Sequence, residues 1–260
     1  MKTKLGKKLP MSEVAYTNMY GSKDDQYRIC EEFYSIQGEG QLSGTWAYFV
    51  RFSECNLRCT WCDTKFSYAK PGVTGEWSTT KQLLRRINET GTKYVVLTGG
   101  EPCLQPNLQV LTKTLQENGI HVTIETNSTI QRPDVIPDLW SLSPKLQSAK
   151  GVFYELADLV YYVWNQPDPV QLKFVTLNKD DFIEMIKLLD DIEDAHDPTT
   201  SRGNGKLTVP VYTQPDGYRE DYIEAIRETI EWSKELKKDY DVRPMLQFHR
   251  LIWGADSIGV

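Results

Sequence analysis

Short apolar segments rich in Val, Ile, Tyr and Phe alternate with segments whose apolar residues return every three or four positions. The first kind has the length and composition of buried strands, and the second kind is typical of helices with one buried face. Strands that alternate with helices indicate a mostly parallel sheet. The pattern therefore predicts an α/β fold in which a single domain forms an open or partial barrel.

The same pattern places the individual elements. Strands are expected at residues 46–52, 94–98, 121–125, 139–142, 172–176, 207–212 and 245–249. Helices are expected at residues 80–88, 108–118, 182–189 and 223–236, and Gly119 is expected to end the second of them. Residues 193–206 are polar and contain Gly and Pro, which predicts a surface loop. Residues 1–30 lack periodicity and predict an N-terminal extension to a core domain of residues 31–260.

Composition narrows the class of protein. Of the 260 residues, 40% are hydrophobic and 25% are charged, so the chain can bury one sizeable core without crosslinks. A net charge of −6 argues against binding nucleic acid through bulk charge. The sequence lacks the run of about 18 apolar residues that a membrane span needs, and it lacks a signal peptide. We therefore expect a cytoplasmic protein whose cysteines are reduced.

Three of the five cysteines lie close together, in Cys55-Asn-Leu-Arg-Cys59-Thr-Trp-Cys62. Such a group in a reducing compartment indicates metal binding. A [4Fe–4S] cluster held by only three thiolates keeps one iron free for a substrate or cofactor, whereas structural zinc takes four protein ligands. The alternative is a noncatalytic zinc-binding interaction module with a distant fourth ligand, for which the candidates are His121, His249 and Cys103. Because Cys30 and Cys103 lack metal spacing, we expect both to be small buried residues.

Unusual polar motifs follow several expected strands, where ligands gather in parallel α/β folds. They are residues 98–102 (Thr-Gly-Gly-Glu-Pro), 125–127 (Glu-Thr-Asn), 143–145 (Ser-Pro-Lys) and 214–217 (Gln-Pro-Asp-Gly), preceded by the glycine-containing loop 35–40. Arg51 could hold a carboxylate in two parallel bonds or form a surface ion pair. Thr64 could ligate Mg²⁺ or cap a turn, and Lys173 could face the site or solvent. Together with the cysteines, these motifs indicate a site at one edge of the sheet.

In combination these motifs resemble a known family. The chain is similar to the 7-carboxy-7-deazaguanine synthase family in a series of segments that follow one another in the same order. They are residues 33–40, 49–52 and 55–64, the four strand-end motifs, residues 172–175 and the segment from His249-Arg250 to Val260. This family belongs to the radical S-adenosylmethionine (SAM) superfamily, and the resemblance covers roughly residues 31–260.

The resemblance implies both a fold and a reaction. The fold would be a partial (β/α)6-type radical SAM barrel with a C-terminal tail over the substrate. The reaction would convert 6-carboxy-5,6,7,8-tetrahydropterin to 7-carboxy-7-deazaguanine, a queuosine precursor, with loss of ammonia. The enzyme would be a homodimeric lyase that uses a [4Fe–4S] cluster, SAM and Mg²⁺, and it would receive electrons from a reductase such as a flavodoxin.

The resemblance also implies roles for individual residues. Cys55, Cys59 and Cys62 would hold the cluster, Glu125 would belong to the catalytic group, and Thr64 would ligate Mg²⁺. The substrate-binding residues would be Ile36, Gln37, Gly38, Glu39, Arg51, Thr98 and Val260. The SAM-binding residues would be Gly100, Glu101, Ser143, Pro144, Lys145, Gln214, Pro215, Asp216 and Gly217.

The chain departs from the family's usual residues at three positions. Glu54 and Ser128 occupy positions where the family often has glycine, and Arg250 stands where it often has lysine. None of the three would be a cluster ligand. The cysteine spacing is shared by glycyl-radical-enzyme activases, which must accept a protein loop. Glu39 and Arg51 suit a small anionic ring better, so an activase is the second interpretation.

Overall fold

The computed structural model describes residues 25–70, 74–150, 154–166, 169–199, 204–236, 240–255 and 259. Within these residues, one sheet has the strand order β3-β1-β2-β4-β5-β6-β7-β8-β9. The strands are β1 (Tyr27–Ile36), β2 (Trp46–Phe52), β3 (Glu76–Ser78), β4 (Tyr94–Gly99), β5 (His121–Thr126), β6 (Leu139–Leu142), β7 (Val170–Val175), β8 (Val211–Gln214) and β9 (Val242–Pro244).

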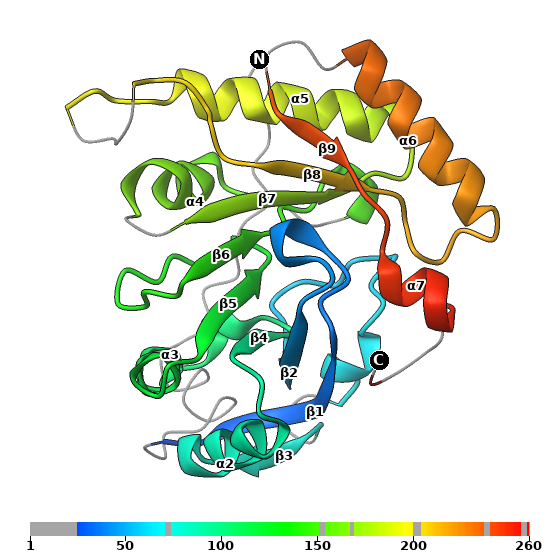
Figure 1. Cartoon of the computed structure of the whole chain (residues 1–260). Helices are drawn as coiled ribbons and strands as arrows, with labels where there is room; N and C mark the ends of the chain where they lie inside the picture. The colour runs from blue at the N-terminus through cyan, green and yellow to red at the C-terminus, as the bar shows by residue number, and fades with distance from the viewer. Residues whose placement is uncertain are drawn as a thin grey trace.

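The sheet is parallel from β2 to β9, and only β1 runs antiparallel to its neighbours β2 and β3. It curves without closing, because β3 and β9 remain as free edges (Figure 1). The carboxyl ends of seven consecutive parallel strands therefore meet along one edge, where loops can build a common site. The predicted α/β fold with a single open barrel is confirmed.

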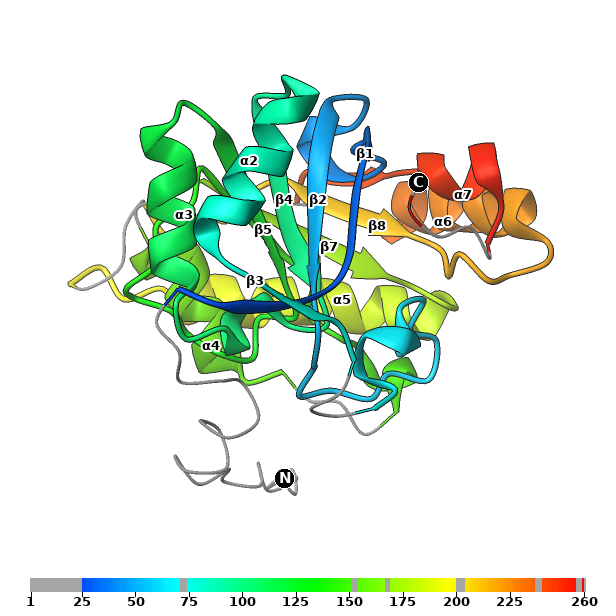
Figure 2. The ribbon, with the colours of Figure 1, turned by 90° about the horizontal axis from the view of Figure 1, so that it is seen from below.

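Helices cover the outer face of the curved sheet (Figures 1 and 2). They are α2 (Thr80–Thr90), α3 (Leu108–Glu117), α4 (Leu156–Val160), α5 (Lys179–Asp194) and α6 (Tyr222–Leu236), and α7 (Phe248–Trp253) follows β9. The apolar face that the periodicity predicted for α3 is buried, since Leu108, Leu111 and Leu115 have no exposed surface. Gly119 adopts a left-handed φ of 70° just after α3, as expected of a residue that ends a helix.

Several boundaries differ from the sequence prediction. β8 begins at Val211 rather than residue 207, and residues 245–249 are not a strand, since Phe248 starts α7. A short apolar run does not by itself show whether a segment is a strand or a helix. The edge strand β9 ends at Pro244, because proline has no N–H to donate to a neighbouring strand. α5 continues to Asp194, so the surface loop begins later than expected. β1 begins at Tyr27, whose side chain is fully buried and whose hydroxyl donates a hydrogen bond to the Asn107 carbonyl.

Residues 1–24 of the expected extension lie outside the described part of the chain. In the part that the structure describes, no helix has both the length and the apolar character needed to span a membrane.

Candidate active site

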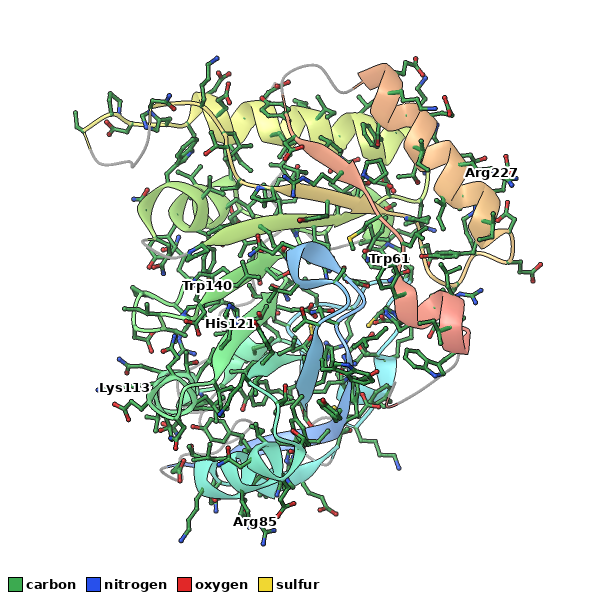
Figure 3. All side chains as sticks on the ribbon, in the orientation of Figure 1. Trp61, Arg85, Lys113, His121, Trp140 and Arg227 are labelled. Carbon is green, nitrogen blue, oxygen red and sulfur yellow. The ribbon has the colours of Figure 1, made fainter. Side chains whose placement is uncertain are left out.

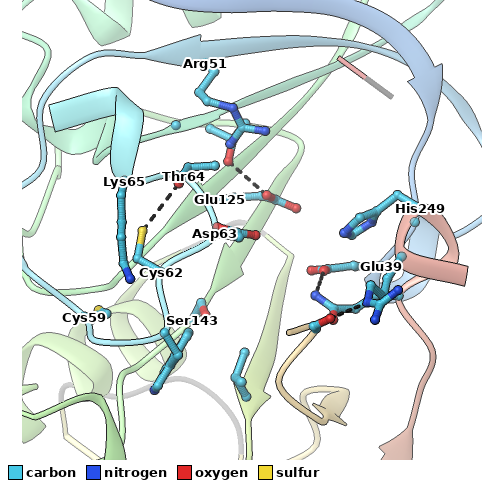
Figure 4. A pocket seen from close by; sticks show the side chains of 18 of the residues that line it. Glu39, Arg51, Cys59, Cys62, Asp63, Thr64, Lys65, Glu125, Ser143 and His249 are labelled. Atoms are coloured by element: carbon cyan, nitrogen blue, oxygen red, sulfur yellow. Dashed lines mark hydrogen bonds between the residues drawn. The ribbon is translucent and has the colours of Figure 1, made fainter. Parts of the chain in front are cut away.

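A cavity of about 840 Å³ lies at the carboxyl ends of the strands. Most of the residues that the sequence assigned to a site line it: Ile36, Gln37, Gly38, Glu39, Arg51, Cys55, Cys59, Cys62, Thr64, Thr98, Gly100, Glu125, Ser143, Lys145, Gln214, Asp216 and Gly217. Figure 4 shows cysteines, carboxylates and basic side chains facing this common space. Glu101, Pro144 and Pro215 are not among the lining residues. Val260 lies outside the described residues.

The three cysteines belong to the loop that follows β2, and all three line the cavity. Polar groups surround them: the Leu57 N–H lies 3.4 Å from Cys55 Sγ, and Thr64 Oγ1 lies 3.6 Å from Cys62 Sγ. Among the described residues, no three His, Cys, Asp or Glu side chains are already grouped as metal ligands, so the thiols would gather on cluster binding. Burial raises the pKa of Cys55 to about 12, and a bound iron would displace that proton. The donor set suits a cluster with three protein ligands.

The other two cysteines lie apart from this loop. Cys103 is buried, and its Sγ lies 3.5 Å from Thr126 Oγ1, as expected of a small residue in the core. Cys30 is only half-buried, which differs from the expectation, and its Sγ lies 3.4 Å from the Arg51 carbonyl oxygen. Neither of them lines the cavity.

The Gly99-Gly100 pair joins β4 to the cysteine loop. The Gly100 N–H donates to the Phe52 carbonyl at 2.9 Å. A Cβ atom at Gly100 would lie 1.8 Å from the Glu54 carbonyl oxygen, a distance that no side chain can occupy. Gly99 has a φ of 120°, which strongly favours glycine. Both glycines are therefore required for the close approach of the two backbone segments that carry the site.

Glu101 does not have the expected SAM-facing position. Its side chain is fully buried. Its carboxylate accepts bonds from the Cys103 N–H at 2.9 Å, the Thr126 hydroxyl at 2.7 Å and the Asn127 N–H at 2.8 Å. Burial raises the pKa of Glu101, and these donors oppose that effect. Glu101 thus links the ends of β4 and β5 to each other, and Gly100 is the residue of this motif's Gly-Glu pair that lines the cavity.

Two departures from the family's residues occur at strained backbone positions. Glu54 has a φ of 73° and Ser128 has a φ of 65°. The left-handed region is unfavourable for residues with a Cβ atom and costs them roughly 1–2 kcal/mol. Both are buried, so the surrounding contacts impose this conformation. The third departure, Arg250, lines the cavity, and its Nε donates to the Gly217 carbonyl.

A buried lysine joins two carboxylates in the middle of the cavity. Lys173 on β7 is 6% exposed and donates from Nζ to Glu39 and, at 3.4 Å, to Glu125 Oε1. Glu39 also accepts from the Gln214 and Gln247 amides at 3.1 and 2.8 Å (Figure 4). We call Glu39, Lys173 and Glu125 the central triad. Two carboxylates and one ammonium leave it with a net negative charge.

The charges of the central triad depend on one another. Burial alone would raise the pKa of Glu39, but Lys173 and His249 lower it to about 2. Burial alone would lower the pKa of Lys173, but Glu125 and Glu39 raise it above its ordinary value. Glu125 Oε2 accepts from the Thr98 hydroxyl at 3.0 Å, and its Oε1 accepts from the Gln37 amide at 3.2 Å. Glu39 and Lys173 are therefore ionised at neutral pH, and hydrogen bonds hold all three side chains in place.

Arg51 lies in the cavity wall rather than on the surface. Its Nε donates to Glu31 Oε2 at 2.6 Å, and its side chain is 17% exposed. Within the described residues, its two terminal amino groups form no hydrogen bond, so they are available to a ligand. The ion pair with Glu31 thus orients the guanidinium without using its outer edge.

Several lining residues were absent from the sequence assignment: Glu31, Phe33, Asp63, Asn127, Lys173, Gln247 and His249. Of these, Lys173 carried a usable signal, because a charged residue interrupted an otherwise apolar strand. It points into the site and not to solvent. Glu31 and Phe33 come from β1, and Gln247 and His249 come from the segment around α7, whose positions the pattern did not predict. Asp63 directly follows Cys62, and Asn127 directly follows β5.

Comparisons with known proteins agree with this geometry. Residues 50–146 match the Radical SAM superfamily. The 7-carboxy-7-deazaguanine synthase of Rhodopirellula baltica is 35% identical in an alignment of 216 positions that covers 78% of each chain. That of Clostridium acetobutylicum is 35% identical over 236 residues, which are 90% of this chain and 99% of the relative.

Solved structures give the same result. A crystal structure of QueE from Escherichia coli has a TM-score of 0.60 and 26% sequence identity, and the match covers 84% of this chain and 94% of that one. A structure of TYW1 with a lysine-pyruvate adduct has a TM-score of 0.52 at 14% identity, which shows a shared fold alone. Neither the activase nor the zinc module is favoured by these matches. Membership of the radical SAM superfamily implies a [4Fe–4S] cluster and SAM as cofactors. The chain is a radical SAM enzyme and belongs to the 7-carboxy-7-deazaguanine synthase family.

Proposed function

We propose that this enzyme converts 6-carboxy-5,6,7,8-tetrahydropterin to 7-carboxy-7-deazaguanine with loss of ammonia, in the biosynthesis of 7-deazaguanines such as the queuosine precursor. The observation that carries the proposal is the pairing, in one cavity, of three cysteines with the central triad and Arg51. A reduced pterin offers adjacent N–H donors at one edge and a carboxylate at the other. The anionic triad suits the N–H edge, and the free edge of Arg51 suits the carboxylate.

Cys55, Cys59 and Cys62 would hold the cluster, and Gly100, Ser143, Lys145, Gln214, Asp216 and Gly217 would line the SAM site. These cofactors supply one-electron cleavage of SAM, which yields a radical able to remove a hydrogen atom from the substrate. The chain's own residues orient the two ligands and exclude water. Lys145 Nζ bonds to Ser143 Oγ at 2.6 Å, which keeps this ammonium beside the cavity and ready for a carboxylate.

An anaerobic assay tests the proposal. Protein reconstituted with iron and sulfide would be incubated with SAM, Mg²⁺, a reductant and 6-carboxytetrahydropterin, and the product would be identified by mass. We expect a brown protein, cleavage of SAM and the mass of 7-carboxy-7-deazaguanine. Cleavage of SAM without any change in the pterin would contradict the proposed substrate.

We further propose a cytoplasmic homodimer that receives its electrons from a reductase such as a flavodoxin.

Thr64 is proposed as a ligand of Mg²⁺. Its hydroxyl lies in the cavity wall next to Cys62, and a hydroxyl oxygen is a suitable hard ligand for an ion that takes few protein ligands. We expect Thr64→Ala to raise the Mg²⁺ concentration for half-maximal turnover roughly tenfold, while the dissociation constant of SAM stays unchanged. Thr64→Ser, which keeps the oxygen, should restore the Mg²⁺ dependence. An unchanged Mg²⁺ titration in Thr64→Ala would count against this role.

The C-terminal carboxylate of Val260 is proposed to accept N–H donors of the pterin together with the central triad. The support is that Gly259 lines the cavity, where an added Cβ atom would lie 4.0 Å from Glu31 Oε1 and from Phe33 Cβ. One extra residue displaces a terminal carboxylate by about 3.3–3.6 Å. A two-residue C-terminal extension should therefore raise the KM for the pterin at least about tenfold without altering SAM binding. An N-terminal extension is the control, and equal KM values for the two proteins would disprove the contact.

A further inference from the structure

Residues 247–250, which we call the bridge segment, connect two walls of the cavity. On one side, the Gln247 amide donates from Nε2 to Glu39 Oε1 at 2.8 Å. On the other side, Arg250 Nε donates to the Gly217 carbonyl. Glu39 belongs to the central triad, whereas Gly217 belongs to the turn that is assigned to SAM. The bridge segment therefore contacts the substrate side and the SAM side of the cavity at the same time.

Polar contacts hold the bridge segment in place. None of the six residues of α7, all of which the structure describes, is buried. The Gln247 N–H donates to the Tyr222 hydroxyl at 2.9 Å, and the Phe248 N–H donates to the Gly38 carbonyl at 3.3 Å. The Arg250 guanidinium lies over the Tyr222 ring, 5.4 Å from its centre. A segment with so little apolar burial has low local stability, so its position depends on the groups that bond to it.

The bridge segment also packs closely against both walls. A Cβ atom added at Gly38 would lie 2.8 Å from His249 Nδ1, and one added at Gly217 would lie 2.7 Å from Gln247 Oε1. Figure 4 shows the His249 ring next to Glu39. Contacts this close leave no free space between the walls and the segment. A displacement of either wall therefore has to move the bridge segment as well.

The charge of Glu39 fixes the orientation of the Gln247 amide. The pKa of Glu39 is about 2, so its carboxylate is ionised and can only accept hydrogen bonds. The amide nitrogen of Gln247 therefore faces Glu39, and its Oε1 lies against Gly217. The Gln247 side chain is 7% exposed, and its Oε1 accepts no hydrogen bond from any described residue. A buried unpaired acceptor is unfavourable, so a movement of the turn that brings a donor to Oε1 would be stabilising.

We propose that Gln247 is a positioning residue that couples the binding of SAM to the binding of the pterin. This inference rests on the proposed function, in which Glu39 accepts N–H donors of the pterin and Gly217 lines the SAM site. When SAM fixes the turn, Arg250 and Gln247 fix the bridge segment. Gln247 then holds the Glu39 carboxylate in the orientation that accepts the pterin. Because such coupling is reciprocal, the pterin must raise the affinity for SAM by the same factor.

Binding measurements without turnover provide the test. Reconstituted enzyme is kept anaerobic and without a reductant, so SAM and 6-carboxytetrahydropterin bind but SAM is not cleaved. Titration calorimetry gives the dissociation constant of each ligand in the absence and in the presence of the other. Gln247→Met keeps the length of the side chain and removes the amide. Arg250→Met is the second variant, because it removes the bond to Gly217 and leaves Glu39 untouched.

Gln116→Met is the matched control. Gln116 lies on α3 and also donates from Nε2 to a carboxylate, Asp138 Oδ2, at 3.2 Å, but it does not line the cavity. Figure 3 shows Lys113 of the same helix well away from Trp61, which lines the cavity. Thermal unfolding of every variant shows whether it folds. Arg250 is half-buried, so its variant decides the question if Gln247→Met fails to fold.

We expect wild type to bind the pterin roughly tenfold more tightly with SAM than without it, and the pterin to tighten SAM binding by the same factor. In Gln247→Met and in Arg250→Met this factor should fall to about one, while SAM alone binds as in wild type. The control should keep the wild-type factor.

Two results would overturn the coupling role of Gln247. One is a wild-type enzyme whose pterin affinity is the same with and without SAM. The other is a Gln247→Met enzyme whose pterin affinity falls equally in both conditions, since that is the effect of a merely structural residue. A wild-type enzyme that binds SAM but no pterin in either condition would instead refute the proposed function, and the inference with it.

Discussion

Replacement of Cys59 by alanine is expected to abolish iron binding and SAM cleavage together. Cys59 is the middle ligand of the proposed set and is 8% exposed, so no other thiol can move into its place without rebuilding the loop. Two remaining thiolates are too few for a cluster that three normally hold. The measurements are iron and sulfide content, visible absorbance and 5′-deoxyadenosine formation after anaerobic reconstitution.

Cys30→Ala is the matched control for this experiment. Cys30 is a half-buried cysteine on β1 that does not line the cavity, so its variant should keep full iron content and turnover. Circular dichroism and thermal unfolding before reconstitution would show that both variants fold. Full iron content in Cys59→Ala would remove this residue from the ligand set, whereas iron loss in both variants would indicate a folding defect.

Lys173→Met should lower kcat/KM for the pterin by roughly a hundredfold or more. Removal of one partner of a buried charged pair costs about 3–5 kcal/mol, because the remaining charge is uncompensated. Here two carboxylates would remain, Glu39 and Glu125, held in one cavity without the ammonium that joins them. We expect the loss mainly in substrate binding, with SAM affinity and cluster content near wild type.

The pH profile of this variant distinguishes a charge effect from simple damage. With Lys173 present, the pKa of Glu39 is about 2, so the carboxylate is ionised across the working range of pH. Without the ammonium, burial is opposed only by His249 and the Gln247 amide, so the pKa of Glu39 should rise from about 2. The acidic limb of the kcat/KM profile should therefore move toward neutral pH. An acidic limb at the wild-type position would contradict the proposed role of the lysine.

Lys179→Met serves as the control for Lys173→Met. Lys179 pairs with Glu235 on the surface, and both side chains are about half exposed, at 43% and 59%. An exposed pair contributes about 0–1 kcal/mol, so this variant should retain its thermal stability and its pH profile. Thermal unfolding of both variants would separate a loss of stability from a loss of binding.

The sequence and the structure agree best where a local rule applies. The buried faces of α2 and α3 follow from apolar spacing, and Gly119 ends its helix because glycine tolerates a positive φ. Prediction from the sequence was wrong where contacts between residues far apart in the chain determine the secondary structure. Residues 245–249 are apolar enough for a strand, yet Phe248 begins α7, whose chain is fixed by long-range bonds such as that from the Gln247 N–H to the Tyr222 hydroxyl.

Glu101 and Lys173 show the same difference between what local sequence predicts and what tertiary contacts determine. Glu101 follows a Gly-Gly turn, as a ligand-binding residue would, but its carboxylate is occupied by backbone and hydroxyl donors from β5, about 25 residues later in the chain. Lys173 was ambiguous in the sequence, because a strand lysine can face either side of a sheet. Its direction depends on Glu39 and Glu125, which only the curvature of the sheet brings together.

The sequence by itself determined most of the alternating strands and helices from β2 to α6, the cysteine triplet and the set of strand-end motifs, because these depend on residue type and spacing along the chain. The tertiary structure alone decided which motif faces the cavity and which side chains share a charge interaction there. Those properties depend on burial and on distances between residues far apart in sequence. For that reason Glu101 links two strand ends instead of lining the cavity, and Lys173 became part of the site.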